Sequence, residues 1–346
     1  MSKTILRSNG FPLALAIMLL GSFFIITSCG GGGGGGGGGV SGITYDGLIT
    51  QATVSSTNAN IIFSAVWNGG SSSGSASFLK VSSTKDLKAN GMVALFKQMG
   101  DRAVSDVTDF AAQSNKIMSA TQVNETYNGL VSGTLTITGS IDPNTFTGSL
   151  TMTYVNFNDG DGYTTDGTIL FRIDGFDTTH ELITDGTMSF TLWRTRSTNS
   201  DISLTGSIRV QENFYDNSDT LTVNVDGRDN STGDTFRFQN FVETDVYNDI
   251  ILPSTDTETI SGRVYVRQYG YVDVTTTTPL NYASVSQEYP DSGGLILLAG
   301  AGGSKAAVTP TSTLNVKIEV DADGDDSYEY TATYAWSDLA GAPVAP

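Results

Sequence analysis

Apolar and polar residues alternate along much of the chain, and this pattern predicts antiparallel β-strands with one buried face and one wet face. From about Tyr127 a glycine followed by Thr or Ser and a mostly alternating apolar stretch recurs, with copies that begin at Gly133, Gly148, Gly167, Gly186 and Gly206. Their spacings of 15, 19, 19 and 20 residues fit two short strands with their turns. The sequence therefore predicts a mainly β fold of antiparallel hairpin repeats, which form a curled sheet, a barrel or a sandwich.

The last part of the chain alternates in the same way but is richer in aromatic residues. Residues 262–266 and 270–274 are predicted to pair as one hairpin. A later strand is expected to bury Leu314, Val316, Ile318 and Val320, and one face of its partner carries Tyr328, Tyr330, Ala332, Tyr334 and Trp336. These segments predict a C-terminal β module.

Two segments before the repeats have the spacing of helices. Residues 61–67 follow the polar segment 57–60 and precede Gly69, which fits a short capped helix, with a strand as the alternative. Apolar residues then recur every three or four positions from about Thr84 to Gln113, which predicts an amphipathic helix. Because its other face holds several aspartates, we expect this helix to pack on the core and not on a membrane.

The N-terminal residues follow a secretory pattern. Lys3 and Arg7 precede an apolar stretch, residues 11–26, that is short for a spanning helix. Ser28 and Cys29 come next, and Cys29 is the only cysteine of the chain. This arrangement resembles the lipobox signal of bacterial lipoproteins. The resemblance implies cleavage before Cys29 and acylation of that residue.

Ten glycines, Gly30–Gly39, follow the cysteine directly. Such a run predicts a flexible spacer with a root-mean-square span of about 16–19 Å. The residue after Cys29 is glycine and not the aspartate that, in Gram-negative lipoproteins, signals retention in the inner membrane. By that resemblance we expect a lipid-anchored protein of the outer membrane, facing the periplasm or the cell surface.

These patterns divide the chain into six predicted parts. A boundary is expected near Pro253, where the repeats end. The parts are a signal peptide (1–28), the lipidated cysteine with its poly-glycine linker (29–41), an N-terminal segment with the amphipathic helix (42–126), an antiparallel β-hairpin repeat domain (127–250), a linker (251–258) and the C-terminal β module (259–346).

The body also resembles uncharacterised β-rich lipoproteins of the proteobacterial outer membrane. The resemblance rests on the glycine repeats and on segments 264–272, 289–294, 302–306 and 320–325. It implies no particular activity.

Composition narrows the set of partners. The chain has 36 acidic and 18 basic residues and a net charge of −18, so it is expected to repel nucleic acids and anionic lipid headgroups. A single cysteine leaves no disulfide or thiolate metal site once it is acylated. We therefore expect contact with the membrane through the acyl chains on Cys29, an envelope or extracellular protein or glycan as partner, and no nucleic acid.

One acidic segment is a candidate metal site. Asp321, Asp323, Asp325 and Glu329 resemble a calcium loop, because carboxylates at alternate positions can wrap a hard cation. The segment departs from an EF-hand, which would need glycine where Asp326 stands and glutamate where Ala332 stands. It lies between two predicted strands, where an acidic turn needs no metal. Calcium is the one candidate cofactor.

Three functions of different class follow from these observations. The first is a non-catalytic structural, adhesive or binding module on a lipid anchor, since no catalytic motif was found. The second is a β-barrel that binds an apolar ligand such as a lipid, with a cavity bounded by Leu150, Phe171, Phe190 and Val223. The third is a hydrolase of envelope glycans or esters, which would need two carboxylates roughly 5–9 Å apart in a cleft.

Overall fold

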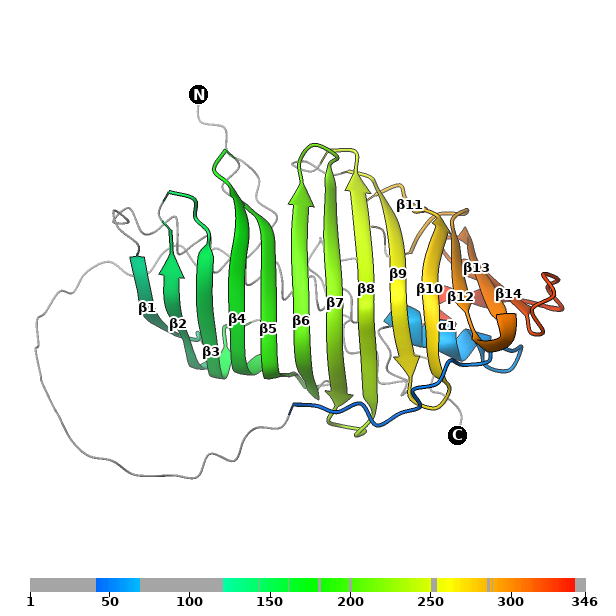
Figure 1. Ribbon diagram of the computed structural model, residues 1–346, viewed down its shortest axis with the longest axis horizontal. Coiled ribbons are helices and arrows are strands. Elements are labelled where there is room, and N and C mark those ends of the chain that lie inside the picture. Colours follow the sequence, from blue (N-terminus) through cyan, green and yellow to red (C-terminus); the bar gives the residue numbers. More distant parts are fainter. Residues whose placement is uncertain are drawn as a thin grey trace, which may run out of the picture. The chain divides into compact units, whose positions relative to one another are not determined.

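The computed structural model describes residues 42–68, 121–142, 144–160, 162–179, 182–198, 201–249, 254–284, 287 and 289–339. The chain divides after residue 41, and all described residues belong to the unit that begins at Gly42. This unit holds one antiparallel sheet and the helices α1 (Ala59–Asn68) and α3 (Trp336–Leu339) (Figure 1). The predicted mainly β class with a small helical part near the N-terminus is confirmed.

Fifteen strands form the sheet. They are β1 (Thr121–Asn128), β2 (Ser132–Ile141), β3 (Gly148–Asn158), β4 (Thr164–Asp177), β5 (Leu182–Arg196), β6 (Asp201–Asn213), β7 (Ser218–Asp229), β8 (Thr235–Tyr247), β9 (Asp256–Val266), β10 (Gly270–Thr278), β11 (Leu280–Tyr282), β12 (Leu295–Ala299), β13 (Lys305–Ser312), β14 (Asn315–Asp321) and β15 (Tyr330–Ala335). Strands β1 to β10 lie in chain order, β12 to β15 follow, and β11 pairs with β9. The order ends at β1 and β15, so the sheet is open and the barrel among the expected arrangements is not formed.

Each glycine repeat supplies one long strand, and the expectation of two short strands per repeat was wrong. Strands β2 to β6 contain between 10 and 15 residues. Four of the five repeat glycines lie inside their strands and not in the turns between them. The 15 to 20 residues between successive repeats therefore correspond to the length of one strand plus one turn.

Four of the five repeat glycines lie where a neighbouring backbone approaches closely, whereas Gly186 faces the ring of Phe171. Gly206 on β6 has a φ of +134°, and a Cβ there would lie 2.1 Å from the carbonyl oxygen of Asn224 on β7. Gly133 on β2 and Gly167 on β4 meet the carbonyl oxygens of their neighbours in the same way, beside shifts of the strand register. An L side chain would collide at these positions, which is why the strands carry glycine there.

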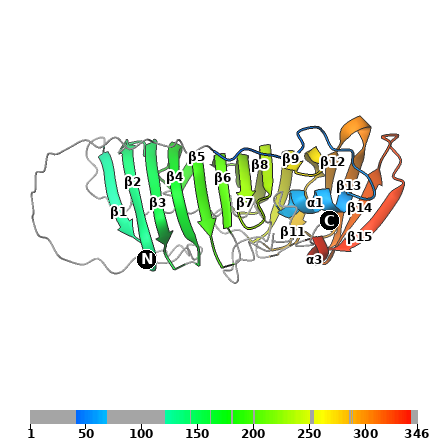
Figure 2. The ribbon, with the colours of Figure 1, turned by 90° about the horizontal axis from the view of Figure 1, so that it is seen from below.

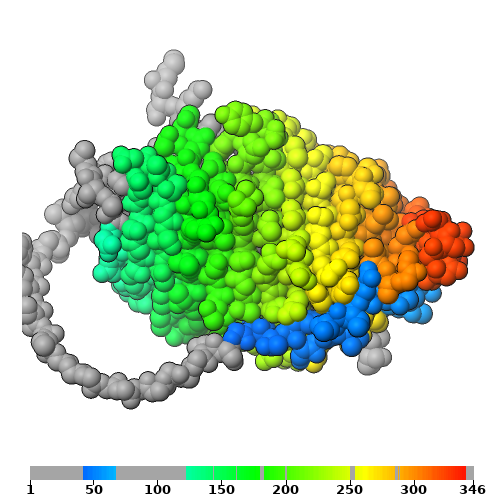
Figure 3. Space-filling model, viewed as in Figure 1, coloured from blue at the N-terminus to red at the C-terminus, as the bar shows by residue number. Residues whose placement is uncertain are grey.

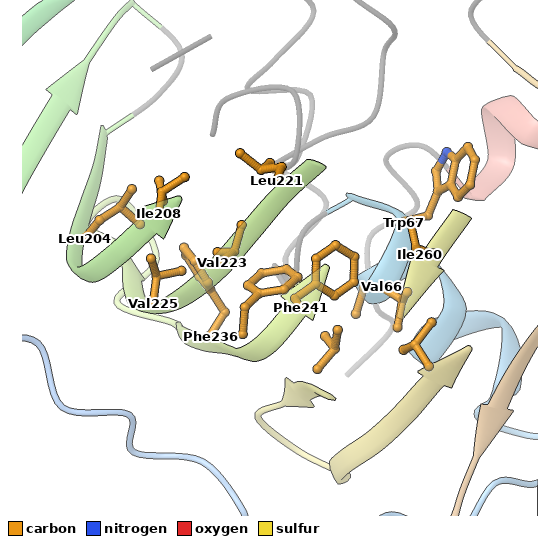
Figure 4. Close-up of a cluster of buried hydrophobic side chains, with 14 of the residues drawn as sticks. Val66, Trp67, Leu204, Ile208, Leu221, Val223, Val225, Phe236, Phe241 and Ile260 are labelled. Carbon is orange, nitrogen blue, oxygen red and sulfur yellow. The ribbon is translucent and has the colours of Figure 1, made fainter. Parts of the chain in front are cut away.

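The apolar sides of the strands form one hydrophobic core. Figure 4 shows its middle, where β6 to β9 contribute Leu204, Ile208, Leu221, Val223, Val225, Phe236, Phe241 and Ile260, and α1 contributes Val66 and Trp67. Alternation along each strand sends these side chains to one face. The opposite face of the same strands carries Thr, Arg and Asp.

Helix α1 lies on the apolar face beside β9 and β14, with α3 next to it (Figure 2). Trp336 of α3 packs against Trp67 of α1, with ring centroids 4.7 Å apart. The ring of Tyr289 stacks on Trp336 at 5.3 Å. Just before α1, the Asn58 side chain accepts a hydrogen bond from the Ser55 N–H at 2.8 Å. The helix predicted over residues 61–67 is thus confirmed, although it begins earlier, at Ala59. The helix predicted over 84–113 lies outside the described residues.

The C-terminal strands follow the prediction with three differences, of which the first is that Tyr328 precedes β15, which begins at Tyr330. β9 and β10 form the expected hairpin, and β14 pairs with β15 while burying Val316, Ile318 and Val320. Leu314 is instead 72% exposed ahead of β14, and Trp336 belongs to α3 because β15 ends at Ala335. The segment predicted as a linker, 251–258, overlaps β9, since Asp256, Thr257 and Glu258 belong to this strand and pair directly with β8.

Residues 42–54, hereafter the strap, cross the strand ends on their way to α1 (blue in Figure 1). The Leu48 N–H donates to the Arg267 carbonyl at 3.0 Å, and the Ala52 N–H donates to the Tyr271 carbonyl at 2.8 Å. The Asp46 carboxylate pairs with the Arg267 guanidinium at 3.1 Å. These contacts fix the strap to the turn between β9 and β10. No helix within the described ranges is long and apolar enough to cross a membrane.

Candidate functional site

The best-supported candidate from the sequence, Cys29, lies outside the described residues, so its acylation stays a prediction. The described part of the chain offers four further features. They are the polar face of the sheet, a groove at one end of that face, the acidic turn after β14 and a cluster of buried carboxylates.

The solvent-facing side of strands β3 to β10, hereafter the polar face, is lined by paired charges and hydroxyls. Figure 3 shows the strands following one another, from green to yellow, across one broad face. Five Arg–Asp pairs join neighbouring strands, namely Asp166–Arg196, Arg194–Asp201, Asp185–Arg209, Asp226–Arg237 and Arg263–Asp273. Threonines also meet across strands, such as Thr153 with Thr168 and Thr220 with Thr244. The result is a broad polar surface on which local charges cancel.

The surroundings of the polar face shift the pKa values of Asp201 and Tyr45. The hydrogen bond from Arg194, together with one from the Asn230 amide, holds the pKa of Asp201 below its usual value. Where the strap meets the face, Tyr45 packs edge-on against Tyr265, with ring centroids 5.5 Å apart. Burial there raises the pKa of Tyr45 to about 12.

A groove of about 430 Å³ opens at the end of the polar face where β2 and β4 begin and β3 and β5 end. It is lined by Ser132, Asn156, Asn158, Gly162, Thr164, Arg196, Ser197 and Thr198. The lining offers hydroxyls, amides and one guanidinium, all groups that make hydrogen bonds. Sequence reasoning missed this groove because its residues come from four strand ends and form no local motif.

Backbone irregularities at Gly133 and Asn156 shape this groove. Asn156 has a φ of +46°, and its N–H donates to the side-chain carboxylate of Asp166 on β4, at 2.8 Å, and not to a backbone carbonyl. A Cβ at Gly133 would lie 2.1 Å from the Asn156 carbonyl oxygen. The bulge leaves the Asn156 amide oxygen to accept a hydrogen bond from Arg196 at 3.0 Å.

The acidic turn brings the four predicted calcium residues together. Carboxylate oxygens of Asp321, Asp323, Asp325 and Glu329 all lie within 4.8 Å of one another. Asp321 is fully shielded from solvent, and the other three are exposed. The geometry thus agrees with the spacing argument that singled them out.

The Asp321 carboxylate already has protein partners. It accepts hydrogen bonds from the N–H groups of Gly324 and Asp326 at 2.7 and 3.0 Å, and the Lys305 ammonium lies 3.2 Å away. Burial by itself raises the pKa of Asp321, but these hydrogen bonds outweigh it and hold the pKa below its usual value. The lysine supplies a positive charge where a cation would sit. Calcium binding at this turn stays a prediction.

A second acidic cluster was not predicted. Glu243 and Asp245 on β8 and Glu258 on β9 place carboxylate oxygens within 4.8 Å of one another, and all three are buried. The Tyr282 hydroxyl donates to Glu258 at 2.7 Å. The available signal was that Glu243 and Asp245 continue the core-facing alternation of Phe241. Because of its burial, this cluster lies in the interior and not in a cleft open to a polymeric substrate.

Comparisons with protein families, with curated proteins and with solved structures found no match for this chain.

Proposed function

We propose that the protein is an outer-membrane lipoprotein, anchored through acyl chains on Cys29, whose β body is a non-catalytic structural, adhesive or binding module. The observation that carries this proposal is the polar face, where neighbouring strands present hydroxyls and internally paired charges. Although the chain has a net charge of −18, such a face can meet a polar partner without strong local repulsion. Its strands are paired on both sides, so the surface is preorganised for contact.

The strap supports the anchored arrangement. The chain is hydrogen-bonded to the body from Asp46 and Leu48 onward. Between Cys29 and the first described residue, Gly42, stand twelve residues, which span at most about 43 Å when fully extended. An acylated Cys29 would therefore hold the body close to the membrane surface while the glycines let it reorient.

Neither alternative function gains an observation from the described residues. The four side chains expected to bound an apolar cavity, Leu150, Phe171, Phe190 and Val223, are buried members of the hydrophobic core of an open sheet. Outside the acidic turn, the described residues hold one further group of three clustered carboxylates, those of Glu243, Asp245 and Glu258, and all three residues are buried.

Cross-linking of intact cells followed by purification of the acylated full-length protein tests the proposal. We expect one specific envelope or extracellular partner to be recovered. We also expect Arg263→Glu, which breaks a charge pair on the polar face, to reduce that recovery. The control is Asp216→Lys, in the exposed turn between β6 and β7. Recovery that is unchanged in Arg263→Glu, or capture of a substrate that is turned over, would contradict a non-catalytic binding face.

A further inference from the structure

The groove at the end of the polar face differs from the rest of this acidic chain. Among the described residues that line it, none carries a carboxylate or an apolar side chain. In a chain with twice as many acidic as basic residues, such a lining is unusual. A groove without carboxylates does not attract cations, so the ligand chemistry must be sought among neutral or anionic groups.

Arg196 is the charged group of the groove, and its charge is balanced. Its Nη2 donates to the Asn156 amide oxygen at 3.0 Å and also pairs with Asp166. Within the described part of the chain, Nε is buried without a hydrogen-bond partner, and about a third of the side chain is exposed. The paired guanidinium therefore presents a polar edge to the groove but little net charge to hold an anion. The net charge of the chain also repels anions at long range.

The remaining lining groups both donate and accept hydrogen bonds. The hydroxyls of Ser132, Thr164 and Thr198 and the amides of Asn156 and Asn158 can do either. A ligand that matches such a lining must itself carry many groups of both kinds. Hydroxyl groups meet this requirement, since each has one donor and two acceptor positions.

Exposed apolar side chains stand directly beside this polar lining. Leu130, Val131 and Val155 are 70%, 67% and 51% exposed, which is rare for side chains of their size in this structure. The turn that carries Val131 is held against the end of β3, because the Val131 N–H donates to the Asn158 carbonyl at 3.0 Å. A polar groove with an apolar rim matches a sugar ring, whose hydroxyls lie at its edge and whose C–H groups form apolar faces.

An extended peptide fits the site less well. Peptides that bind sheets add a strand at a free edge. Strands β3, β4 and β5, which contribute most of the groove, are paired on both sides. The sheet therefore offers no backbone ladder to a peptide at this place.

We propose that the groove formed by Ser132, Asn156, Asn158, Thr164, Arg196 and Thr198 binds a neutral glycan, with Leu130, Val131 and Val155 packing against its sugar rings. This inference rests on the proposed function in one respect, namely that the body is a binding module. It adds a class of ligand, and it places the binding of that ligand at one end of the polar face, apart from the partner contact tested at Arg263.

Glycan binding by the full-length protein in detergent micelles tests this assignment. The probes are N-acetylhexosamine oligosaccharides, which have the chemistry of cell-wall strands, and neutral hexose oligosaccharides, which have that of extracellular polysaccharides. Binding of either set supports the proposal and identifies the source. Absence of binding by the folded protein would overturn it, as would binding only of acidic glycans or only of peptides.

Variants locate the binding in the groove. We expect Arg196→Gln and Val131→Asp each to weaken binding about tenfold, equivalent to about 1.4 kcal/mol. Arg172→Gln, on β4 of the same face but outside the groove, should leave binding unchanged. If Arg196→Gln does not fold, Val131→Asp decides, because its side chain is exposed and not part of the core. Equal binding by Val131→Asp and the control would overturn the assignment. Membrane anchoring and partner capture are measured separately, so failure of glycan binding is distinguishable from failure of the proposed function.

Discussion

Arg194 and Asp201 illustrate how single residues balance charge on the polar face. The aspartate receives hydrogen bonds from Arg194 and Asn230. Pairs of this kind at the surface contribute little free energy individually. On the polar face their repetition cancels charge that would otherwise repel neighbouring strands.

The depressed pKa of Asp201 predicts a pH dependence of stability. A carboxylate whose pKa is lower in the folded than in the unfolded protein stabilises the fold above its unfolded pKa of about 3.9. That stabilisation is lost as the pH falls through the folded pKa. We expect Asp201→Asn to lower the melting temperature at pH 7 and to make the loss of stability below about pH 4 less steep.

Thermal unfolding followed by circular dichroism across this pH range measures the effect. Arg194→Gln is the matched control, since it removes the other partner of the pair and should give the same flattening. If Asp201→Asn lost stability in acid as steeply as the unmodified protein, the Arg194 pair would not be the source of this pH dependence.

Lys305 predicts how the acidic turn responds to calcium. Its ammonium lies beside Asp321 and Asp326, so it opposes a cation at the same carboxylates. We expect Lys305→Gln to bind Ca²⁺ more tightly than the unmodified protein in calorimetric titration. Lys317→Gln, on the neighbouring strand, is the control. Equal Ca²⁺ affinity in the unmodified protein and in Lys305→Gln would show that Lys305 does not weaken calcium binding at the turn.

At the scale of elements, the repeated glycines allow strand backbones to approach at register shifts. We expect Gly206→Ala to destabilise the fold. The new Cβ would lie 2.1 Å from a carbonyl oxygen on β7, and the alanine would have to adopt a φ of +134°. The backbone strain alone costs about 1–3 kcal/mol. Urea unfolding should therefore show a lower midpoint.

Gly233→Ala is the matched control for this experiment. Gly233 also has a positive φ, of +82°, but nothing lies within 4 Å of a Cβ placed there. Gly206→Ala should lose distinctly more stability than Gly233→Ala, because only the former adds a collision. An equal loss in both variants would mean that close approach of the strands is not what requires the repeat glycines.

The strands themselves could be predicted from the sequence because alternation follows directly from the pleat of a β-strand. Ile137, Met152 and Phe171, for example, are buried as their alternation required. The length of the strands could not be predicted, since a glycine inside a strand and a glycine in a turn look alike in sequence. Only the register of the neighbouring strand distinguishes Gly206 from Gly233.

The candidate site was predictable in one part only. The four residues of the acidic turn are close in sequence, and their proximity in space followed from that. The groove joins Ser132, Asn156 and Arg196 from separate strands, and the buried cluster joins Glu243 and Glu258 across β8 and β9. Such juxtapositions depend on strand register, which the alternation alone does not specify.

At the scale of the whole molecule, one open sheet presents a polar face, and its strand ends contact the strap. The strap follows the poly-glycine linker in the chain, and Asp46, Leu48 and Ala52 of the strap bond to the end of the sheet at Arg267 and Tyr271. Anchoring at Cys29 would make this sheet a surface feature of the envelope. The anchor is therefore the claim on which the proposed function most depends.

Metabolic labelling with a palmitate analogue, followed by fractionation of the cell envelope, tests that claim most directly. We expect the unmodified protein to carry the label and to sediment with the outer membrane. Cys29→Ala should carry no label and leave the membrane fraction. Deletion of Gly30–Gly39 that retains Cys29 is the control and should remain labelled and membrane-bound. A Cys29→Ala protein that stayed in the outer membrane would contradict the account.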